Sequence, residues 1–308
     1  MGFDVITNIK TIRRLMVPEK KTYDISVVKN SGESALFDPE KILRSLKNVG
    51  ASDEVAEMIV RAVELEAYDG IPTREIYRKT FSLLRKYSRG ASVRYRLKDA
   101  ISQLGNTGYP FERFVADLFA EKGYHVRVGM VIRGYSINHE VDVVAMNHDR
   151  IFTIECKYHV NPSSKSDVKV PMYILSRYRD IENAWEQHPE YEGKIYQQWI
   201  ATNTRFTDDA IAFAEAYHLN ILSWDYPKGE SIRDWIQMYG VYPITCLSCI
   251  SKSEKQMLIS KGMVSCGTIY KNPHLLDKTP LPSSKKIMLK KELMYLYDGI
   301  LKEKERLE

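Results

Sequence analysis

The stretch IFTIECKYHV, residues 151–160, joins strand-forming apolar residues to two central charges, Glu155 and Lys157. Side chains two residues apart on a β-strand share a face, so Glu155 and Lys157 project together, while Ile154 and Cys156 point into the opposite layer. A buried strand normally excludes such charges unless they are paired or functional. The stretch therefore predicts a strand with a core on one side and a chemical site on the other.

A second strand, HEVDVVAM at residues 139–146, precedes it across the four-residue turn 147–150. Antiparallel pairing around this turn is expected to place Asp142 beyond Glu155, toward one end of the hairpin. A bulge or a splaying of the strands would then bring the two carboxylates close enough to share a metal ion. The alternative is structural, with Glu155 and Lys157 forming cross-strand salt bridges on a solvated face.

Two carboxylates, a lysine and a water suit phosphodiester hydrolysis. Carboxylate oxygens are the ligands that Mg²⁺ prefers, and Mg²⁺ polarises a phosphoryl oxygen and lowers the pKa of bound water. Lys157 would orient or deprotonate that water and stabilise the charge that grows on the phosphate. This pattern predicts Asp142 and Glu155 as metal ligands.

The surrounding pattern predicts an α/β domain over residues 105–242. A helix at 111–122 carries Phe111, Phe114, Val115 and Leu118 on one face and ends at Gly123. After the hairpin come a helix at about 167–185, a strand from 195, a helix capped by Thr207 and a strand from 219. This order, αββαβαβ, is typical of a mixed central sheet.

Two smaller domains are expected on either side. Residues 22–104 read as a turn with a short strand at Val27–Val28 followed by four amphipathic helices, the first with an Asp38-Pro39 start. Residues 243–308 read as a basic helical domain, in which Ser251 and Glu254 form a capping box.

The net charge of +5 is unevenly distributed. Residues 105–244 carry 14 basic against 19 acidic residues, whereas residues 245–308 carry 12 against 7. Excess cationic charge attracts nucleic acid or nucleotide phosphates. The helix–Gly–apolar rhythm of 251–269 is similar in local shape to a helix-hairpin-helix DNA-binding unit, with Lys252, Lys255, Lys261 and the lysines of 285–291 as phosphate contacts. A packing or dimerisation bundle is the alternative.

The chain has no apolar run of about 18 residues and no signal-peptide core, so we expect a cytoplasmic protein with no membrane partner. Four cysteines are too few for a disulfide scaffold. Cys246, Cys249, Cys266 and His274 allow a zinc site, but small buried hydrophobic side chains are the favoured interpretation of the cysteines.

The pattern Asp142 … Glu155-Cys156-Lys157 resembles the D…ExK signature of PD-(D/E)xK nucleases. The blocks GYPFERFVADLFAEKGYHV, EVDVVA, TIECKY and WIATNTRFTDDAIAFA, over about 105–230, resemble Mrr-like restriction endonuclease domains. The resemblance implies a PD-(D/E)xK nuclease core with Mg²⁺ (or Mn²⁺) as cofactor and double-stranded DNA as substrate. It implies catalytic roles for Glu112, Asp142, Glu155 and Lys157. The stretch HEVDVV departs from the family pattern, because Glu140 is also within reach of the metal and is an alternative ligand.

The N-terminal segment resembles an ATP-cone, a nucleotide-sensing domain, in VVKNSG, FDPEKI, GIPTREI and ASVRYRLK. The resemblance implies ATP or dATP as a regulatory ligand near Lys29, Asp38, Lys41, Thr73 and Lys98. Ammonium groups at a turn and at a helix start are suited to phosphate binding. The segment departs from the cone pattern at Ala35, and a cone that no longer binds nucleotide is the alternative.

Together these features predict an Mg²⁺-dependent endodeoxyribonuclease that acts in restriction or defence against foreign DNA and is regulated by ATP or dATP. A nucleotide-sensing DNA-binding regulator that does not cleave, and a structure-specific repair or junction nuclease, are the alternatives. The sequence leaves open whether the chain forms a homodimer or a higher oligomer.

Overall fold

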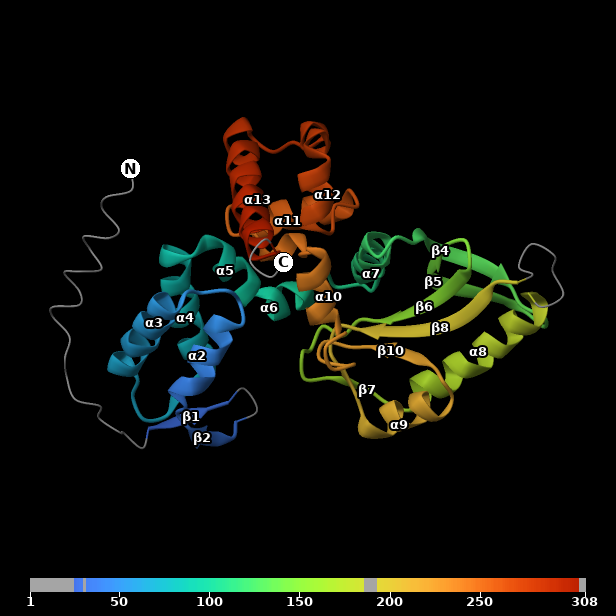
Figure 1. Ribbon diagram of the computed structural model, residues 1–308, viewed down its shortest axis with the longest axis horizontal. Helices are drawn as coiled ribbons and strands as arrows, with labels where there is room; N and C mark the ends of the chain where they lie inside the picture. The colour runs from blue at the N-terminus through green and yellow to red at the C-terminus, as the bar shows by residue number, and fades with distance from the viewer. Residues whose placement is uncertain (1–24, 30–31, 186–192, 305–308) are drawn as a thin grey trace. The chain divides into compact units, whose positions relative to one another are not determined.

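The computed structural model describes residues 25–29, 32–185 and 193–304 (Figure 1). The chain divides into two compact units, Met1–Leu84 and Arg85–Glu308. Residues 22–24, at the predicted start of the first domain, and two residues of its predicted turn, 30 and 31, lie outside the described residues.

The first unit combines a small sheet with three helices. The strands β1 (Ser26–Val28), β2 (Ser34–Leu36) and β3 (Ile71–Pro72) form a sheet in the order β2-β1-β3. The helices are α2 (Pro39–Lys47), α3 (Asp53–Glu66) and most of α4 (Thr73–Tyr87), which enters the second unit at Arg85. The predicted Asp38 cap is confirmed, because its side chain accepts a hydrogen bond from the N–H of Glu40. The prediction contained β1 but neither β2 nor β3.

The boundary between the units differs from the predicted one at residue 104. The helices α5 (Arg89–Tyr95) and α6 (Leu97–Ser102) belong to the second unit. Val93, Leu97 and Ile101 lie in the large hydrophobic core of that unit. In that core α5 contacts α13 (Ser283–Lys304) and α6 contacts the 3₁₀ turn Ile244–Cys246, so both helices fold with the second unit.

The second unit is built on a five-stranded mixed sheet. Its strands are β4 (His125–Arg133), β5 (Asn138–Met146), β6 (Arg150–Lys157), β8 (Ile195–Thr202) and β10 (Asn220–Leu222), in the order β10-β8-β6-β5-β4. β6, β8 and β10 run parallel, and β4, β5 and β6 pair antiparallel. The predicted mixed sheet is confirmed, but β4 was missing from the prediction.

Helices cover both faces of this sheet (Figure 1). α7 (Tyr109–Glu121) buries Phe111, Phe114 and Phe119 in the core that also contains Ile154 and Cys156. α8 (Lys169–Trp185) and α9 (Asp208–Ala216) pack on the other face, in clusters that contain Ile174, Ala210 and Ile200. Two short strands, β7 (Lys165–Ser166) and β9 (Arg205–Phe206), pair beside them.

The C-terminal helices pack into the same core as α7. They are α10 (Ile232–Tyr239), α11 (Lys252–Ser260), α12 (Cys266–Lys271) and α13 (Ser283–Lys304), with 3₁₀ turns at Ile244–Cys246 and Pro273–Lys278. The predicted capping box of Ser251 and Glu254 is confirmed at α11. The described C-terminal residues therefore pack against α7 as part of the same compact unit.

Cys156, Cys246 and Cys266 are buried as free thiols, as the apolar interpretation expects. Within the described residues, no helix is both long and apolar enough to span a bilayer.

Candidate active site

The site forms where two paired strands separate. β5 and β6 pair from Met146↔Ile151 to Val143↔Ile154, and the ladder stops there. Continued by one step, the same register sets Asp142 opposite Glu155. The expectation that Asp142 lies beyond Glu155 is therefore wrong, because the strands part at the level of both carboxylates and no inserted residue is needed.

Asp142 takes the place of the missing strand pairing. Its Oδ2 accepts a hydrogen bond of 2.7 Å from the backbone N–H of Cys156. The alternation of β5 is also broken at Asp142. Val143 packs in the α7 cluster on one face of the sheet, whereas Val141 packs with Ile181 of α8 on the other face. A side chain that bonds the neighbouring backbone fixes the carboxylate firmly between the two strands.

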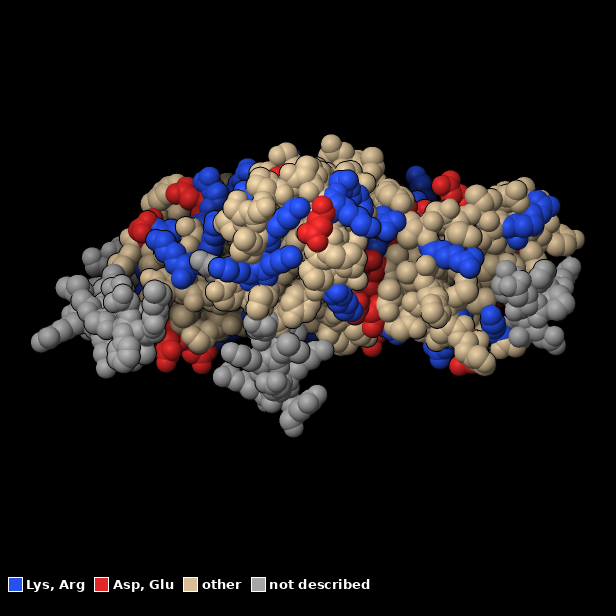
Figure 2. All heavy atoms as spheres, turned by 90° about the horizontal axis from the view of Figure 1, so that it is seen from above, with Lys and Arg blue, Asp and Glu red and all other residues tan. Residues whose placement is uncertain are grey.

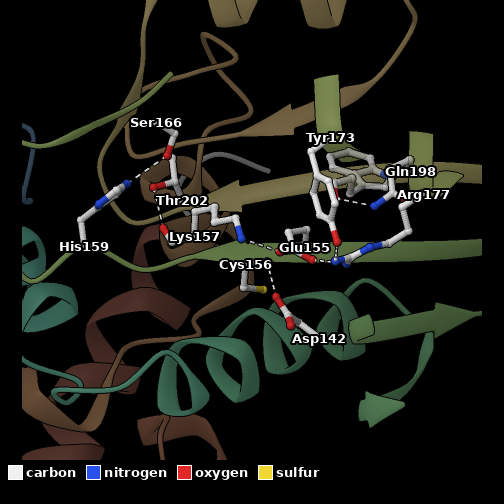
Figure 3. A network of polar contacts seen from close by, with 11 residues as sticks. Asp142, Glu155, Cys156, Lys157, His159, Ser166, Tyr173, Arg177, Gln198 and Thr202 are labelled. Carbon is white, nitrogen blue, oxygen red and sulfur yellow. Dashed lines mark hydrogen bonds and ion pairs between the residues drawn. The ribbon is translucent and has the colours of Figure 1, made fainter. Parts of the chain in front are cut away.

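Glu155 is a buried carboxylate held by two cations. Its side chain is only 7% exposed. Oε1 accepts from Lys157 Nζ at 2.5 Å, and Oε2 accepts from a terminal guanidinium nitrogen of Arg177 at 2.5 Å. Figure 3 shows Glu155 between these two side chains, with Asp142 near the Cys156 backbone. A carboxylate this deeply buried needs such partners to remain charged.

Glu112 of α7 faces the same site. Burial and then the charges of Asp142 and Glu155 raise the pKa of Glu112 to about 7. Burial and then the charge of Glu155 raise the pKa of Asp142 to about 6, against the Cys156 hydrogen bond, which lowers it. The charge of Glu155 acts on both Glu112 and Asp142, and the charge of Asp142 acts on Glu112, so the three predicted carboxylates are electrostatic neighbours. Such clusters are frequent at functional sites.

The chain after Lys157 is fixed by polar contacts to β8 and its end. Thr202 Oγ1 donates to the Lys157 carbonyl at 2.7 Å. Asn203 accepts from the N–H of His159 and donates to its carbonyl, both at 2.8 Å. His159 Nε2 also lies 3.0 Å from Ser166 Oγ. These bonds hold the backbone at the carboxyl end of β6, which limits where the Lys157 side chain can reach.

The donor set fits a hard divalent cation. Asp142 and Glu155, on adjacent strands, offer carboxylate oxygens, which are the ligands that Mg²⁺ and Mn²⁺ prefer. Among the described residues, no three His, Cys, Asp or Glu side chains gather into a complete metal site. Water and a phosphate oxygen would therefore have to supply the remaining ligands, which is usual for Mg²⁺.

Arg177 is the site residue that the sequence prediction missed. It lies three residues after Ile174 and four before Ile181, which are both fully buried on α8. That spacing puts Arg177 on the buried face of the helix. An arginine on a core-facing stripe needs an acidic partner, and this was the signal available in the sequence.

The predicted nucleotide residues divide between the units. Lys29 pairs with Glu33 at 3.1 Å, and Lys41 pairs with Asp38 at 3.7 Å. Thr73 is the first residue of α4. Lys98 lies in α6 of the second unit, where its charged neighbours include Arg205 and Asp225. The structure thus gives no support to Lys98 as part of a nucleotide site in the first unit.

Only some of the C-terminal lysines that were predicted to contact phosphate are exposed. Lys255 is 8% exposed and its Nζ donates to the Thr245 carbonyl at 3.0 Å, so its predicted phosphate contact is wrong. Lys285 Nζ donates to the Cys249 carbonyl. Exposed lysines remain on α11, directly after it and on α13: Lys252, Lys261, Lys290 and Lys291. Figure 2 shows Lys and Arg side chains gathering on the face that these helices present.

Comparison with known proteins identifies the two parts of the second unit. Residues 104–228 match the Mrr-type family described as restriction endonuclease. Residues 242–297 match the family described as AF1548-like, C-terminal. The second match begins at the predicted domain boundary, although its residues share a core with α7.

Relatives of the chain extend this result. An uncharacterized protein of Archaeoglobus fulgidus is 32% identical over 152 residues, which are 49% of this chain and 81% of that protein. The crystal structure of AF1548, a protein of unknown function, aligns at a TM-score of 0.51 and 29% identity, covering 63% of this chain and 100% of that one. The restriction endonuclease MspJI in complex with a 27-mer oligonucleotide aligns at a TM-score of 0.25 and 14% identity, covering 56% of this chain and 38% of that one. A similarity this distant supports no argument about the present chain.

Residues 104–228 are therefore a restriction endonuclease domain on a mixed α/β sheet. The chain belongs to the family of the Archaeoglobus fulgidus protein.

Proposed function

We propose that the second unit hydrolyses phosphodiester bonds of double-stranded DNA with Mg²⁺ or Mn²⁺. The observation that carries this proposal is the buried Glu155 carboxylate, placed opposite Asp142 where the strands separate and paired with Lys157. Burying that many converging charges is costly for a fold that only binds. A restriction endonuclease domain supplies the matching chemistry.

Each side chain has a distinct part in the proposed reaction. Asp142 and Glu155 would hold the cation, which when bound supplies positive charge at the phosphate and lowers the pKa of water. Lys157, with its side chain 37% exposed, would orient the attacking water and stabilise the phosphate's developing charge. Glu112 would add a third acidic group next to Asp142 and would accept a hydrogen bond from the attacking water.

DNA would be held mainly by parts of the chain outside the acidic sheet. Residues 105–244 carry a net negative charge, so they would repel the phosphate backbone without help. The exposed lysines Lys252, Lys261, Lys290 and Lys291 would supply that help. Restriction of foreign DNA is the role that we propose for the cleavage.

We also propose that ATP or dATP regulates cleavage through the first unit. Lys29 and Lys41 lie at a turn after β1 and at the start of α2, and each forms an ion pair with an exposed or half-buried acid. Equal ATP affinity in the wild type and in Lys29→Ala and Lys41→Ala would reject this site. Loss of nucleotide affinity in both variants, with cleavage still measurable, would support it.

The cleavage experiment separates the three candidate functions. Supercoiled plasmid, linear duplex and a four-way junction are each incubated with the full chain and Mg²⁺ or EDTA, with ATP, dATP or neither. We expect Mg²⁺-dependent cutting of duplex DNA that Lys157→Ala loses by about a hundredfold or more. Lys228→Ala, at an exposed lysine outside the site, is the matched control and should cut normally.

Other results favour other functions. DNA that is bound under all these conditions and never cut would identify a regulator. Cutting of the junction alone would identify a structure-specific nuclease. Equal cutting by Lys157→Ala and the wild type would reject the proposed site.

A further inference from the structure

We infer that Arg177 keeps Glu155 from binding a metal ion until a DNA phosphate draws the guanidinium away, so that metal and DNA bind cooperatively. This inference rests on the proposed nuclease function. Its starting point is that both oxygens of Glu155 are occupied, one by Lys157 and one by Arg177. A metal ion that binds Glu155 must therefore share an oxygen with one of these cations or displace it, and the positive charge of the cation opposes the first.

Charge sets the order in which ligands arrive. The two oxygens of Glu155 are each held by a positive side chain, while Asp142 and Glu112 are neighbouring acids that remain open to a cation. A divalent cation that approaches the Glu155 oxygens is opposed by Lys157 and Arg177, and a phosphodiester anion that pairs with Arg177 weakens this opposition. The Arg177 side chain is only 11% exposed, so solvent and salt screen this effect weakly.

The guanidinium is also incompletely bonded where it lies. Its Nε–H is buried and has no hydrogen-bond partner among the described residues. One terminal nitrogen donates to the Tyr173 hydroxyl at 3.1 Å, and the guanidinium carbon lies 5.0 Å from that ring's centroid. An unsatisfied buried donor is unfavourable, and a phosphate oxygen is an acceptor that an arginine can bind with two donors at once.

Tyr173 gives the guanidinium a route outward. Its side chain is 59% exposed on α8, whereas Arg177, one turn later, is buried against Glu155. Figure 3 shows the Tyr173 hydroxyl directed at Arg177, beside Glu155. A tyrosine that contacts both solvent and the buried guanidinium can keep hold of it as it moves toward a bound phosphate. Arg177 is thus a positioning residue that acts on Glu155.

Metal binding itself provides the test. Mn²⁺ affinity is measured by electron paramagnetic resonance on the full chain, with and without a phosphorothioate DNA duplex that resists cutting, and with the duplex alone as blank. For the wild type we expect the duplex to raise Mn²⁺ affinity by about tenfold or more. For Arg177→Met we expect DNA-free Mn²⁺ affinity to rise by about tenfold, because a positive charge leaves the site. The DNA effect should then shrink and the cleavage rate should fall.

The matched control is Arg179→Met, an exposed arginine on the same helix, which should behave as the wild type. A merely structural Arg177 would weaken metal binding and cleavage together, so an unchanged or lower DNA-free Mn²⁺ affinity in Arg177→Met overturns the inference. If that variant does not fold, wild-type Mn²⁺ affinity that DNA leaves unchanged overturns it equally. A wild type that binds no Mn²⁺ and cuts no DNA instead refutes the proposed function.

Discussion

Replacing Glu112 by glutamine should stabilise the protein at neutral and alkaline pH. The pKa of Glu112 rises from an ordinary 4.5 to about 7 because of burial and the charges of Asp142 and Glu155. A carboxyl group with a raised folded-state pKa lowers stability as the pH rises from the unfolded pKa to the folded one, and the loss is complete above the folded pKa. Glutamine keeps the shape and removes the charge.

The size of the effect follows from the shift. A shift of one pKa unit corresponds to about 1.4 kcal/mol, so the charged Glu112 lowers the free energy of unfolding by roughly 3 kcal/mol at most. Glu112 is only half-buried, so solvent screening reduces this to about 1–2 kcal/mol. For a unit of this size, that gain corresponds to about 2–8 °C in Tm.

The assay is urea and thermal unfolding in EDTA at pH 8 and at pH 4. We expect Glu112→Gln to be more stable than the wild type at pH 8 and nearly equal to it at pH 4, where Glu112 is mostly protonated in both states. Glu121→Gln, on the same helix but in a surface pair with Lys271, is the control and should show no gain. A Glu112→Gln gain that is absent at pH 8, or equal at both pH values, would refute the reasoning.

Two further predictions concern the framework of the second unit. Glu292→Ala removes the carboxylate that accepts from the N–H groups of Ser248 and Cys249 at 2.7 and 2.8 Å, and should cost about 3–5 kcal/mol in urea unfolding; a loss below about 1 kcal/mol would contradict this. The Asp180 carboxylate accepts a hydrogen bond from the Ser136 hydroxyl, which holds the pKa of Asp180 well below its ordinary value. The contribution of Asp180 to stability is therefore present above about pH 4 and is lost as the pH falls through the lowered pKa. Asp180→Ala removes the acceptor and should speed hydrogen exchange at the Ser136 N–H at pH 7, and unchanged exchange would count against the contact.

Much of the hairpin could be predicted from the sequence, because strand alternation fixes which residues share a face. Ile154 and Cys156 lie in the core, and Glu155 and Lys157 meet on the other side. Local caps such as Ser251 were equally predictable, since a cap depends on neighbours three residues away.

Features that depend on distant partners were not predictable in the same way. The prediction contained no strand at β4, although His125–Arg133 alternates, and Gly129 with a φ of 67° interrupts it. The helices α5 and α6 have apolar faces that would suit either unit, so only the packing of Val93 shows which core they join. The length of the β5–β6 ladder, which sets Asp142 beside Cys156, is decided by how the sheet twists and separates.

The most direct test of the central claim is cleavage by Asp142→Asn, measured beside DNA binding under single-turnover conditions with Mg²⁺. Asparagine can still accept the Cys156 hydrogen bond, so the strands should stay in place. The proposed site predicts DNA binding close to that of the wild type and cleavage slower by about a hundredfold or more, because a metal ligand loses its charge. Cleavage by Asp142→Asn at the wild-type rate, or wild-type cleavage that persists in EDTA, would contradict it.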